Sequence, residues 1–321
     1  MNSEVSAMSD KTATRESYGN ALAELGEINP DVVVLDADLC ESTKTVYFKK
    51  RFPDRFFDCG IAEANMVAVS AGLAACGKIP FCSSFAMFAA GRAFDQIRNA
   101  VGYPHLNVKI GATHAGITVG EDGATHQCLE DIGIMRTIPG MTIINPADDT
   151  EARAAVFAAA ELNGPVYMRF GRYAVPVIFD RATYKFEIGK GVLLTEGRDV
   201  TLIATGIMVD AALTAANLLK ARGISAEVID IHTIKPIDRE LIIASAAKTG
   251  AVVTAEEHNI IGGLGSAVCE VLSESRPTPV IRVGTEDRFG RSGKVPPLLE
   301  MYGLTAGNIV EKAVKAITLK K

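Results

Sequence analysis

The chain has 321 residues, 48% of them apolar, which exceeds the usual size of one domain and is enough to bury two cores. Its net charge of −5 is modest, and Lys and Arg are spread along the sequence, which argues against nucleic acid as its main partner. The longest uncharged stretch, residues 64–77, is too short and too polar to span a membrane.

The sequence shows no export signal and no pattern typical of a structural metal site. The N-terminal stretch MNSEVSAMSDKTATRES carries acidic residues and no apolar core, so we expect residues 1–11 to be a disordered lead-in. None of the six cysteines forms a CxxC pair, and most lie in apolar surroundings, where cysteine behaves as a small hydrophobic residue. We therefore expect no zinc site and a reducing, cytoplasmic location.

Short β-branched runs alternate with longer alanine-rich segments in the first half of the chain, as in a parallel sheet covered by helices. The sequence predicts strands near residues 31–36, 79–82, 106–111, 141–145 and 165–169. It predicts helices near residues 63–76, 90–101 and 150–162. These elements form the first predicted domain, residues 12–180.

Residues 181–197 are richer in charge, Gly and aromatic side chains and show no sustained period, so they are predicted to connect two domains. A second alternating series follows over residues 198–321. Its predicted strands are residues 200–205, 226–231, 251–255 and 280–283, and its predicted helices are residues 208–222, 239–249, 264–273 and 306–317. We expect an α/β chain of two doubly wound domains with mainly parallel sheets.

Ligands of parallel α/β sheets bind at the carboxyl ends of the strands, and two early segments there carry more polar groups than a turn requires. Residues 36–43 (DADLCEST) follow the first strand, and on composition alone an acidic N-cap explains them. In residues 58–66 (DCGIAEANM), Glu63 opens a helix that is otherwise nearly all Ala, Val, Leu and Gly. The helix dipole favours such a Glu, but it does not explain the apolar setting, in which a carboxyl group is suited to exchanging a proton.

Residues 113–127 (THAGITVGEDGATHQ) form the third segment, and here we favour a functional site. They hold two of the five histidines, two acidic residues and three glycines directly after a strand. A solvated surface loop of this length would be expected to carry Lys, Ser and Pro instead. Histidine titrates near neutral pH, and together with Asp122 it suggests a site for a polyhydroxylated or phosphorylated molecule.

Residues 261–268 (IGGLGSAV) also follow a strand and open a helix, which could indicate dinucleotide binding. The spacing is not GxGxxG, and no acidic residue ends a strand at the expected distance, so a close helix–strand turn is favoured. The neighbouring Glu256, Glu257 and His258 could cap that turn or meet another subunit.

Taken together, these segments resemble the transketolase family over about residues 12–318. GEDGATHQ at residues 120–127 is close to the family's GEDGPTHQ, with Ala124 where Pro is usual. GIAEANM at residues 60–66 resembles the segment with the cofactor-activating glutamate, DADL at 36–39 resembles SADL, and EEHNIIGGLGSAV at 256–268 resembles the family's C-terminal domain. The resemblance implies a pyrimidine-binding domain followed by a transketolase C-terminal domain.

The resemblance implies thiamine diphosphate as the cofactor. Glu63 would hydrogen-bond the N1′ atom of its aminopyrimidine and favour the imino form that removes a proton from the thiazolium ring. Phe85 and Phe88 match aromatic side chains that contact the pyrimidine, and a third family aromatic falls at Phe81 or Cys82. Asp38 matches an aspartate on the pyrimidine side.

The resemblance also implies a set of substrate contacts. Asp122 and His126 match the pair that contacts donor hydroxyls near the reacting carbons, which makes Glu63 and His126 the candidate catalytic residues. The side chains that would hold a sugar phosphate are Arg15, Ser42, His114 and Arg169. Arg172 is a possible substitute for Arg169.

The motif that binds the diphosphate through Mg²⁺, a GDG segment followed by Asn, does not occur in this sequence. Magnesium needs an octahedral set of oxygen ligands. We therefore expect no metal ligand in this chain and a separate N-terminal transketolase subunit that carries the GDG motif. The chain would pair with a second copy of itself within an α2β2 assembly, although a truncated chain is an alternative.

The leading hypothesis is two-carbon ketol transfer between phosphosugars. A 1-deoxy-xylulose-5-phosphate synthase or a 2-oxoacid dehydrogenase beta subunit shares this domain pair, but THAGITVGEDGATHQ argues against both. A non-catalytic regulatory or binding subunit that kept the fold is a third reading. The sequence does not identify the sugar, which could belong to the pentose phosphate route or to catabolism of an unusual pentose.

Overall fold

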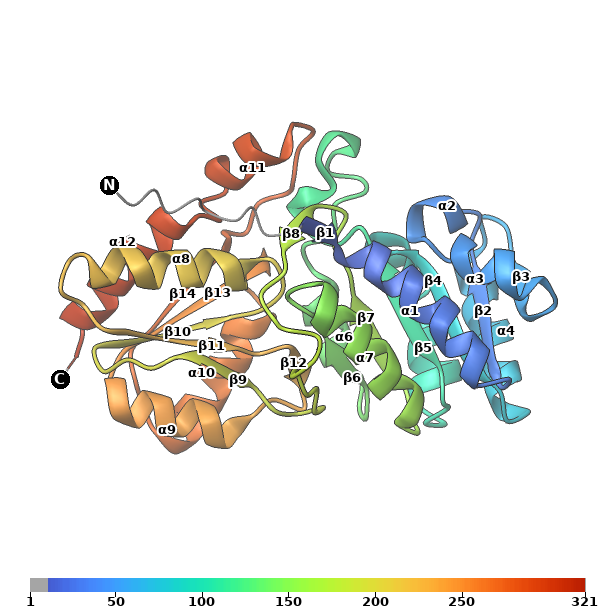
Figure 1. The fold of residues 1–321 in the computed structure, drawn as a ribbon, viewed down its shortest axis with the longest axis horizontal. Coiled ribbons are helices and arrows are strands. Elements are labelled where there is room, and N and C mark those ends of the chain that lie inside the picture. The colour runs from blue at the N-terminus through green and yellow to red at the C-terminus, as the bar shows by residue number, and fades with distance from the viewer. Residues whose placement is uncertain (1–10, 321) are drawn as a thin grey trace.

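The computed structural model describes residues 11–320, so the predicted lead-in, apart from Lys11, lies outside the described residues. The chain forms two α/β units, each built on a sheet of mainly parallel strands, and the expected fold class is confirmed (Figure 1).

The first sheet has seven strands in the order β12-β6-β7-β5-β4-β2-β3. All neighbours in it are parallel except β12 and β6. Its strands are β2 (Val32–Asp36), β3 (Phe56–Asp58), β4 (Ile79–Phe85), β5 (Lys109–Thr113), β6 (Thr142–Ile144), β7 (Val166–Arg169) and β12 (Thr233–Lys235).

Helices cover both faces of this sheet, which is why its strands read as continuous apolar runs. Val32 and Val34 face α1 (Thr14–Ile28) and α7 (Asp149–Glu161), whereas Val33 and Leu35 face the opposite side. The helices on that side are α4 (Glu63–Ala75) and α6 (Asp131–Arg136), with the short α5 (Phe94–Gln96). The predicted helix at residues 63–76 is therefore confirmed within one residue.

The predicted helix near residues 90–101 is helical in the structure, but it is not one regular α-helix. The short α5 lies between two π-helical segments, Met87–Arg92 and Ile97–Gly102, with a break at Ala93. The sequence analysis missed α1, although Tyr18, Leu22 and Leu25 are buried at the spacing of one helical face. Lys11 begins β1 (Lys11–Ala13), so it is not part of a disordered lead-in.

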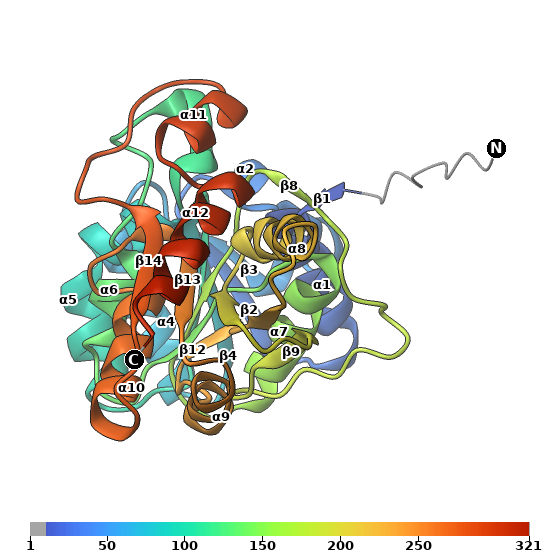
Figure 2. The ribbon, with the colours of Figure 1, turned by 90° about the vertical axis from the view of Figure 1, so that its left-hand side faces the viewer.

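The second sheet has five strands in the order β14-β13-β10-β11-β9. Its strands are β9 (Val192–Thr195), β10 (Val200–Ala204), β11 (Ala226–Asp230), β13 (Val252–Asn259) and β14 (Val280–Thr285). Figures 1 and 2 show helices on both of its faces, α8 (Met208–Lys220) and α12 (Ala306–Thr318) on one and α9 (Arg239–Thr249) and α10 (Leu264–Ser275) on the other. Leu202 faces the first pair and Ile203 the second, as the alternation in a strand requires.

The two units are joined by more than a linker. The segment predicted as the connection contains β9, which is the antiparallel edge of the second sheet. Strand β12, which lies within the second unit in sequence, pairs instead with β6 of the first sheet, with Thr233 opposite Ile144. Within the first domain, β1 and β8 (Ala174–Pro176) form a separate antiparallel pair.

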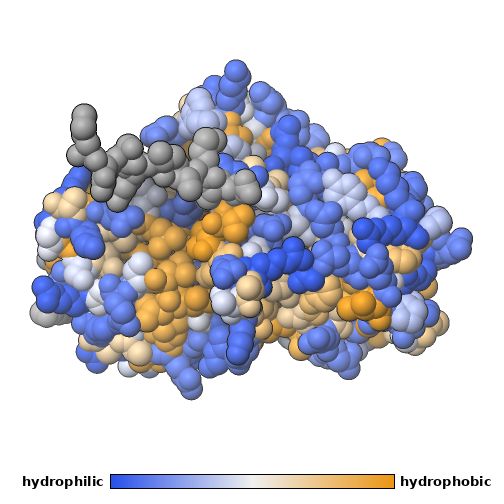
Figure 3. Space-filling model, viewed as in Figure 1, coloured by the Kyte–Doolittle hydropathy of each residue, from blue (hydrophilic) through white to orange (hydrophobic). Residues whose placement is uncertain are grey.

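No helix among the described residues is both long and apolar enough to cross a bilayer. The face in Figure 3 shows an apolar area next to α8 and β9, while the upper part of the first domain on the same face is more hydrophilic. Leu193 on β9 and Leu218 on α8 are exposed.

Candidate active site

A cleft of about 400 Å³ opens at the carboxyl edge of the first sheet, beyond the ends of β2, β3 and β4. This is where α/β sheets place ligands. Four of the predicted site residues, Asp38, Glu63, Phe88 and His126, line it together. The remaining lining residues are Ala37, Leu39, Ile61, Arg92 and Thr125.

Glu63 occupies the first position of α4, where the helix dipole stabilises a carboxylate. Its side chain is only 5% exposed, and the apolar residues of α4 follow it. Its one hydrogen-bond partner among the described residues is Arg92, whose guanidinium donates to Oε1 over 3.0 Å. Because a buried carboxyl group has lost most of its hydrogen bonds to water, binding a hydrogen-bond donor that enters the cleft stabilises it.

Two aspartates that the sequence analysis did not single out shape the loops around the cleft. Asp36, at the end of β2, accepts hydrogen bonds from the hydroxyls of Thr43 and Thr45 and from the Leu39 amide. Burial raises the pKa of Asp36 to about 6, although these hydrogen bonds act in the opposite sense. Asp36 therefore fastens this loop, but it is not the predicted N-cap. Leu39 holds that position before α2 (Cys40–Thr43), and no described side chain caps the helix.

Asp58, at the end of β3, accepts from the amides of both Asp38 and Gly60, each over 3.0 Å. It thereby ties the loop that carries Asp38 to the loop that leads to Glu63. Asp38 itself adopts φ 61°, a left-handed conformation that non-glycine residues rarely take outside turns and functional sites.

A row of rings extends from the cleft toward the loop after β5. Phe85 stacks on His114 with centroids 3.8 Å apart and lies 5.7 Å from Phe88. His126 meets the edge of Phe88 at 5.2 Å. The predicted aromatic residues Phe85 and Phe88 and the two predicted histidines thus form one continuous assembly.

At the other end of this row, Arg15 contacts two other predicted residues, Ser42 and His114. Its guanidinium donates to the backbone oxygen of Ser42 over 2.9 Å and lies 3.1 Å from Nε2 of His114. Because arginine only donates, Nε2 must accept, and the ring proton must reside on Nδ1, which faces the Thr113 hydroxyl at 3.0 Å. Burial and the charge of Arg15 lower the pKa of His114 to about 3, which keeps the ring neutral.

Asp122 and Arg172 lie at the exposed rim of the loop of residues 113–127, where Arg172 lines a separate cavity of about 380 Å³. The Arg172 guanidinium is 3.9 Å from the Asp122 carboxylate and donates to the backbone oxygen of Val119. The side chains of both residues are about 40% exposed. The positive charges of Arg15 and Arg172 act on each other, since Arg172 contributes to lowering the pKa of Arg15 after the larger effect of burial. Such a pair of arginines is suited to an anionic group.

The second domain holds the loop of residues 113–127 in place. Glu257, on β13, accepts from the Thr118 amide over 2.7 Å, and burial raises its pKa to about 7. Gly116 has φ 85°, and a Cβ there would overlap the Glu257 carboxyl group. The loop therefore depends on contacts between domains.

The turn at residues 261–268 has the structural role that the sequence analysis favoured. Both carboxylate oxygens of Glu256 accept from the first amides of α10, those of Leu264 and Gly265, over 2.7 and 2.8 Å. The sequence predicts that Glu256, Glu257 and His258 each either cap this turn or meet another subunit, and in the structure Glu256 caps the turn.

Three predicted positions belong neither to the cleft nor to the groups that adjoin it. The guanidinium of Arg169 pairs with the buried carboxylate of Asp131 at 2.9 Å and donates to the backbone oxygens of Cys128 and Glu257, so it is already engaged inside the protein and contradicts the role of gripping a solute. Phe81 is fully buried in the middle of β4 within the core beneath α1, and Cys82 is fully buried on the opposite face of that strand. Neither supplies the third aromatic residue. The substitute, Arg172, lies at the rim instead.

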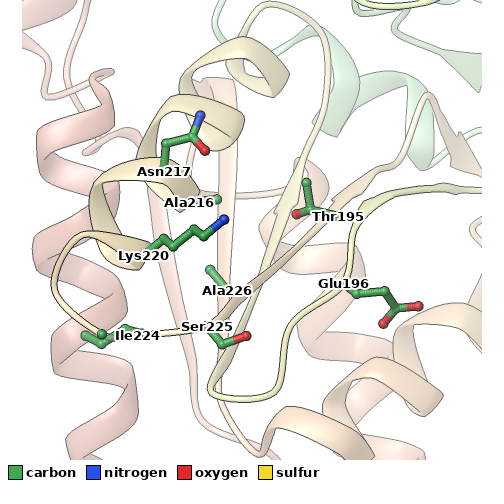
Figure 4. Close-up of a pocket in the computed structure, with 9 residues that line it drawn as sticks. Thr195, Glu196, Ala216, Asn217, Lys220, Ile224, Ser225 and Ala226 are labelled. Carbon is green, nitrogen blue, oxygen red and sulfur yellow. The ribbon is translucent and has the colours of Figure 1, made fainter.

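A second cavity of similar volume lies on the second domain, at the amino end of β11 and the end of β9 (Figure 4). This is the end opposite to the one where parallel sheets bind ligands, and no aromatic ring lines it. Its lining residues are Thr195, Glu196, Ala216, Asn217, Lys220, Gly223, Ile224, Ser225 and Ala226. Over residues 11–320, no group of three or more His, Cys, Asp and Glu side chains is arranged to hold a metal ion.

The sequence analysis also missed Arg92, which contacts both Glu63 and the face of Phe88. The signal was present, because Arg92 is the one charged residue between residues 79 and 94. A single charged residue in an apolar segment near the end of a strand is expected to pair with an oppositely charged side chain.

Comparison with known proteins agrees with this geometry. Residues 10–177 match the model of the transketolase pyrimidine binding domain, and residues 189–309 match that of the transketolase C-terminal domain. A transketolase C-terminal section from Methanocaldococcus jannaschii is 52% identical over 94% of this chain and 95% of its own length. The 6-deoxy-6-sulfo-D-fructose transketolase subunit SqwH of a Clostridium species is 48% identical over 96% of this chain and 95% of its own.

A solved structure described as a split gene transketolase, an inactive beta4 tetramer, is 56% identical to this chain. It superposes with a TM-score of 0.90 over 97% of this chain and all of that one.

Proposed function

The chain belongs to the transketolase family, and we propose that it is the subunit of a two-chain enzyme that moves a two-carbon ketol unit from a ketose phosphate to an aldose phosphate. The observation that carries this proposal is the position of Glu63. Its nearly buried carboxylate opens onto a cleft beside the Phe88 ring and His126, and among residues 11–320 its side chain is paired only with a half-exposed arginine.

The residues of the cleft fit the aminopyrimidine of thiamine diphosphate. A planar ring with polar edges needs an apolar face on which to stack and an acceptor at its edge, and Phe88 and Glu63 provide these. Phe85 supports Phe88 from behind, and Asp38 faces the same cleft from the loop after β2. When bound, the cofactor would supply the nucleophilic carbon that breaks and forms the carbon–carbon bond.

Within this arrangement Glu63 holds or releases the proton at the ring edge. A positioned acid or base of this kind contributes about 10²–10⁴-fold to a rate. His126 lies against the Phe88 ring on the open side of the cleft, where it can exchange a proton with a substrate hydroxyl. We propose Glu63 and His126 as the catalytic residues of this chain.

For the substrate we propose Asp122 with His126 at the donor hydroxyls, and a cationic group for the phosphate made of Arg15, Ser42 and His114. Arg172 replaces Arg169 in this group, because Arg172 is at the rim with Asp122 and its charge acts on Arg15. His114 is 2% exposed and its Nε2 accepts from Arg15, so its part in this group is to orient the Arg15 guanidinium.

We propose that the Mg²⁺ ligands and the grip on the diphosphate come from a second polypeptide that carries a GDG motif. The similarity to a split-gene chain described as inactive when assembled as a beta4 tetramer supports a need for that partner. Two copies of this chain with two of the partner, an α2β2 enzyme in the cytoplasm, form the proposed active state.

The proposal leaves the sugar to experiment. A similar subunit belongs to a 6-deoxy-6-sulfo-D-fructose transketolase, so a sulfonate can take the place of a phosphate in this family. The panel of donors therefore includes pentulose, hexulose and sulfohexulose compounds, which separates the pentose phosphate route from the catabolism of unusual sugars.

The test combines the purified chain with its GDG-bearing partner, thiamine diphosphate and Mg²⁺. The combination should transfer ketol units, and neither chain should do so alone. Glu63→Gln should lower kcat by about 10²–10⁴-fold. Glu240→Gln is the matched control, because Glu240 is also in the first turn of a helix but 91% exposed. Activity of this chain alone, or full activity of Glu63→Gln, would refute the proposal.

A further inference from the structure

Arg92 makes two contacts inside the cleft. Its guanidinium carbon lies 4.1 Å from the centroid of the Phe88 ring, and one of its nitrogens lies 3.0 Å from Oε1 of Glu63. The two partners are the stacking face and the buried acceptor of the site. Arg92 itself is 55% exposed, so solvent reaches the side chain that holds them.

The Arg92 guanidinium makes the same two kinds of contact that an aminopyrimidine would make here. It stacks on an aromatic ring and donates a hydrogen bond from its edge. A guanidinium is planar and delocalised, donates from its edge and stacks on aromatic faces. A protonated aminopyrimidine is also a planar cation with N–H donors at its edge. The two groups would therefore compete for the same ring and the same carboxylate.

We propose that Arg92 is an internal surrogate for the cofactor ring, a positioning residue that keeps Glu63 paired and oriented until the ring displaces it. A buried carboxyl group without a hydrogen-bond partner is unfavourable, so the resident guanidinium keeps this acceptor paired. Because Arg92 is half exposed, its guanidinium can return to water when the ring arrives. This inference rests on the proposed function, since it presupposes that the cleft binds an aminopyrimidine.

The chain contains a matched control for this contact. Arg153 on α7 lies 4.5 Å from the centroid of the Phe157 ring, and its guanidinium pairs with Glu24 of α1 at 2.6 Å. The contact has the same chemistry on the outer face of the first domain. Arg153→Ala therefore removes an equivalent stacked ion pair without changing the cleft.

The first arm of the test needs no ligand. In the NMR spectrum of the full chain, the Arg92 Nε–H signal, assigned by its loss in Arg92→Ala, should shift in Glu63→Gln. The Arg153 signal should stay in place. An Arg92 signal that is unchanged by Glu63→Gln would overturn the inference.

The second arm titrates the full chain with thiamine, without metal, by NMR or calorimetry. Arg92→Ala should bind thiamine about three- to tenfold more tightly than the wild type, because the competitor is gone, and Arg153→Ala should not differ from the wild type. Unchanged or weaker binding by a folded Arg92→Ala, with clear binding by the wild type, would overturn this inference alone. Absence of thiamine binding by every folded variant would overturn the inference, whereas the proposed function is tested separately by ketol transfer in the reconstituted pair.

Discussion

Arg169 and Arg172 are three residues apart, but Arg169 is buried and Arg172 is partly exposed. Replacing each of them in turn therefore tests which one contacts the substrate. We predict that Arg169→Met destabilises the chain, whereas Arg172→Met leaves it stable and weakens substrate binding. Methionine keeps much of the arginine stem, so each change removes chiefly the guanidinium.

The expected magnitude for Arg169 follows from its surroundings. Asp131 is fully buried and accepts from both Arg169 Nε and the Tyr167 hydroxyl at 2.9 Å, and the Arg169 guanidinium also donates to the backbone oxygens of Cys128 and Glu257. Breaking one side of such a buried pair costs about 3–5 kcal/mol of unfolding free energy. For a domain of this size that corresponds to a fall in Tm of roughly 6–20 °C.

Arg172 is 37% exposed, lies 3.9 Å from the Asp122 carboxylate and donates to the backbone oxygen of Val119, so its loss should cost about 1 kcal/mol or less and lower Tm by about 4 °C or less. Losing a charged hydrogen bond to the substrate anion should raise KM about 10- to 150-fold. Thermal unfolding of the chain and kinetics of the reconstituted enzyme measure the two effects.

The double variant Asp131→Asn with Arg169→Met is the control, because it removes both charges of the buried pair and should recover part of the lost stability. A stable Arg169→Met with a raised KM would refute this assignment and restore Arg169 as the phosphate ligand.

The remaining predictions concern the contacts between the domains. Gly116→Ala should lower the free energy of unfolding by at least about 1–3 kcal/mol, since it combines a positive φ with overlap of Glu257, and denaturant unfolding would show it. Burial raises the pKa of Glu151 on α7 from 4.5 to about 7, so the folded state retains a proton that the unfolded state loses. Stability should therefore fall as pH rises from about 4.5 to about 7 and then level off, and Glu151→Gln should flatten that curve; an unaltered curve would contradict the reasoning.

The alternating order of strands and helices could be read from the sequence because both sheets are covered on both faces. Strands buried on two sides are apolar at every position, and the helices between them are alanine-rich, so element type is clear even where the ends are not. α1 was missed because its apolar residues are interrupted by Ser, Gly, Asn and Glu. The three-residue β12 was missed because its partner β6 lies about 90 residues away in the chain, and a pairing this distant leaves no local pattern.

The errors in the site follow from the ends of strands. Phe81 is a candidate only through its match to a family aromatic, and the strand predicted at residues 79–82 extends to Phe85, so Phe81 lies in the middle of β4 and in the core. Similarly, Arg169 is the last residue of β7, and its side chain turns inward to Asp131. Residues in the loops after the strands, such as Asp38, Glu63 and His126, could be placed correctly because the rule of carboxyl ends does not depend on the register of a strand.

Because β12 lies within the second unit in sequence but pairs with β6 of the first sheet, the two units cannot be separated without breaking that sheet. Any cut between residues 180 and 197 would leave the backbone groups along one side of β6 unpaired, and an open strand of that kind recruits other chains. Protein engineers who wish to graft the cofactor cleft onto another scaffold must therefore carry residues 233–235 along or blunt that edge with charge. A modular swap that looks natural from the two domain names would yield aggregates.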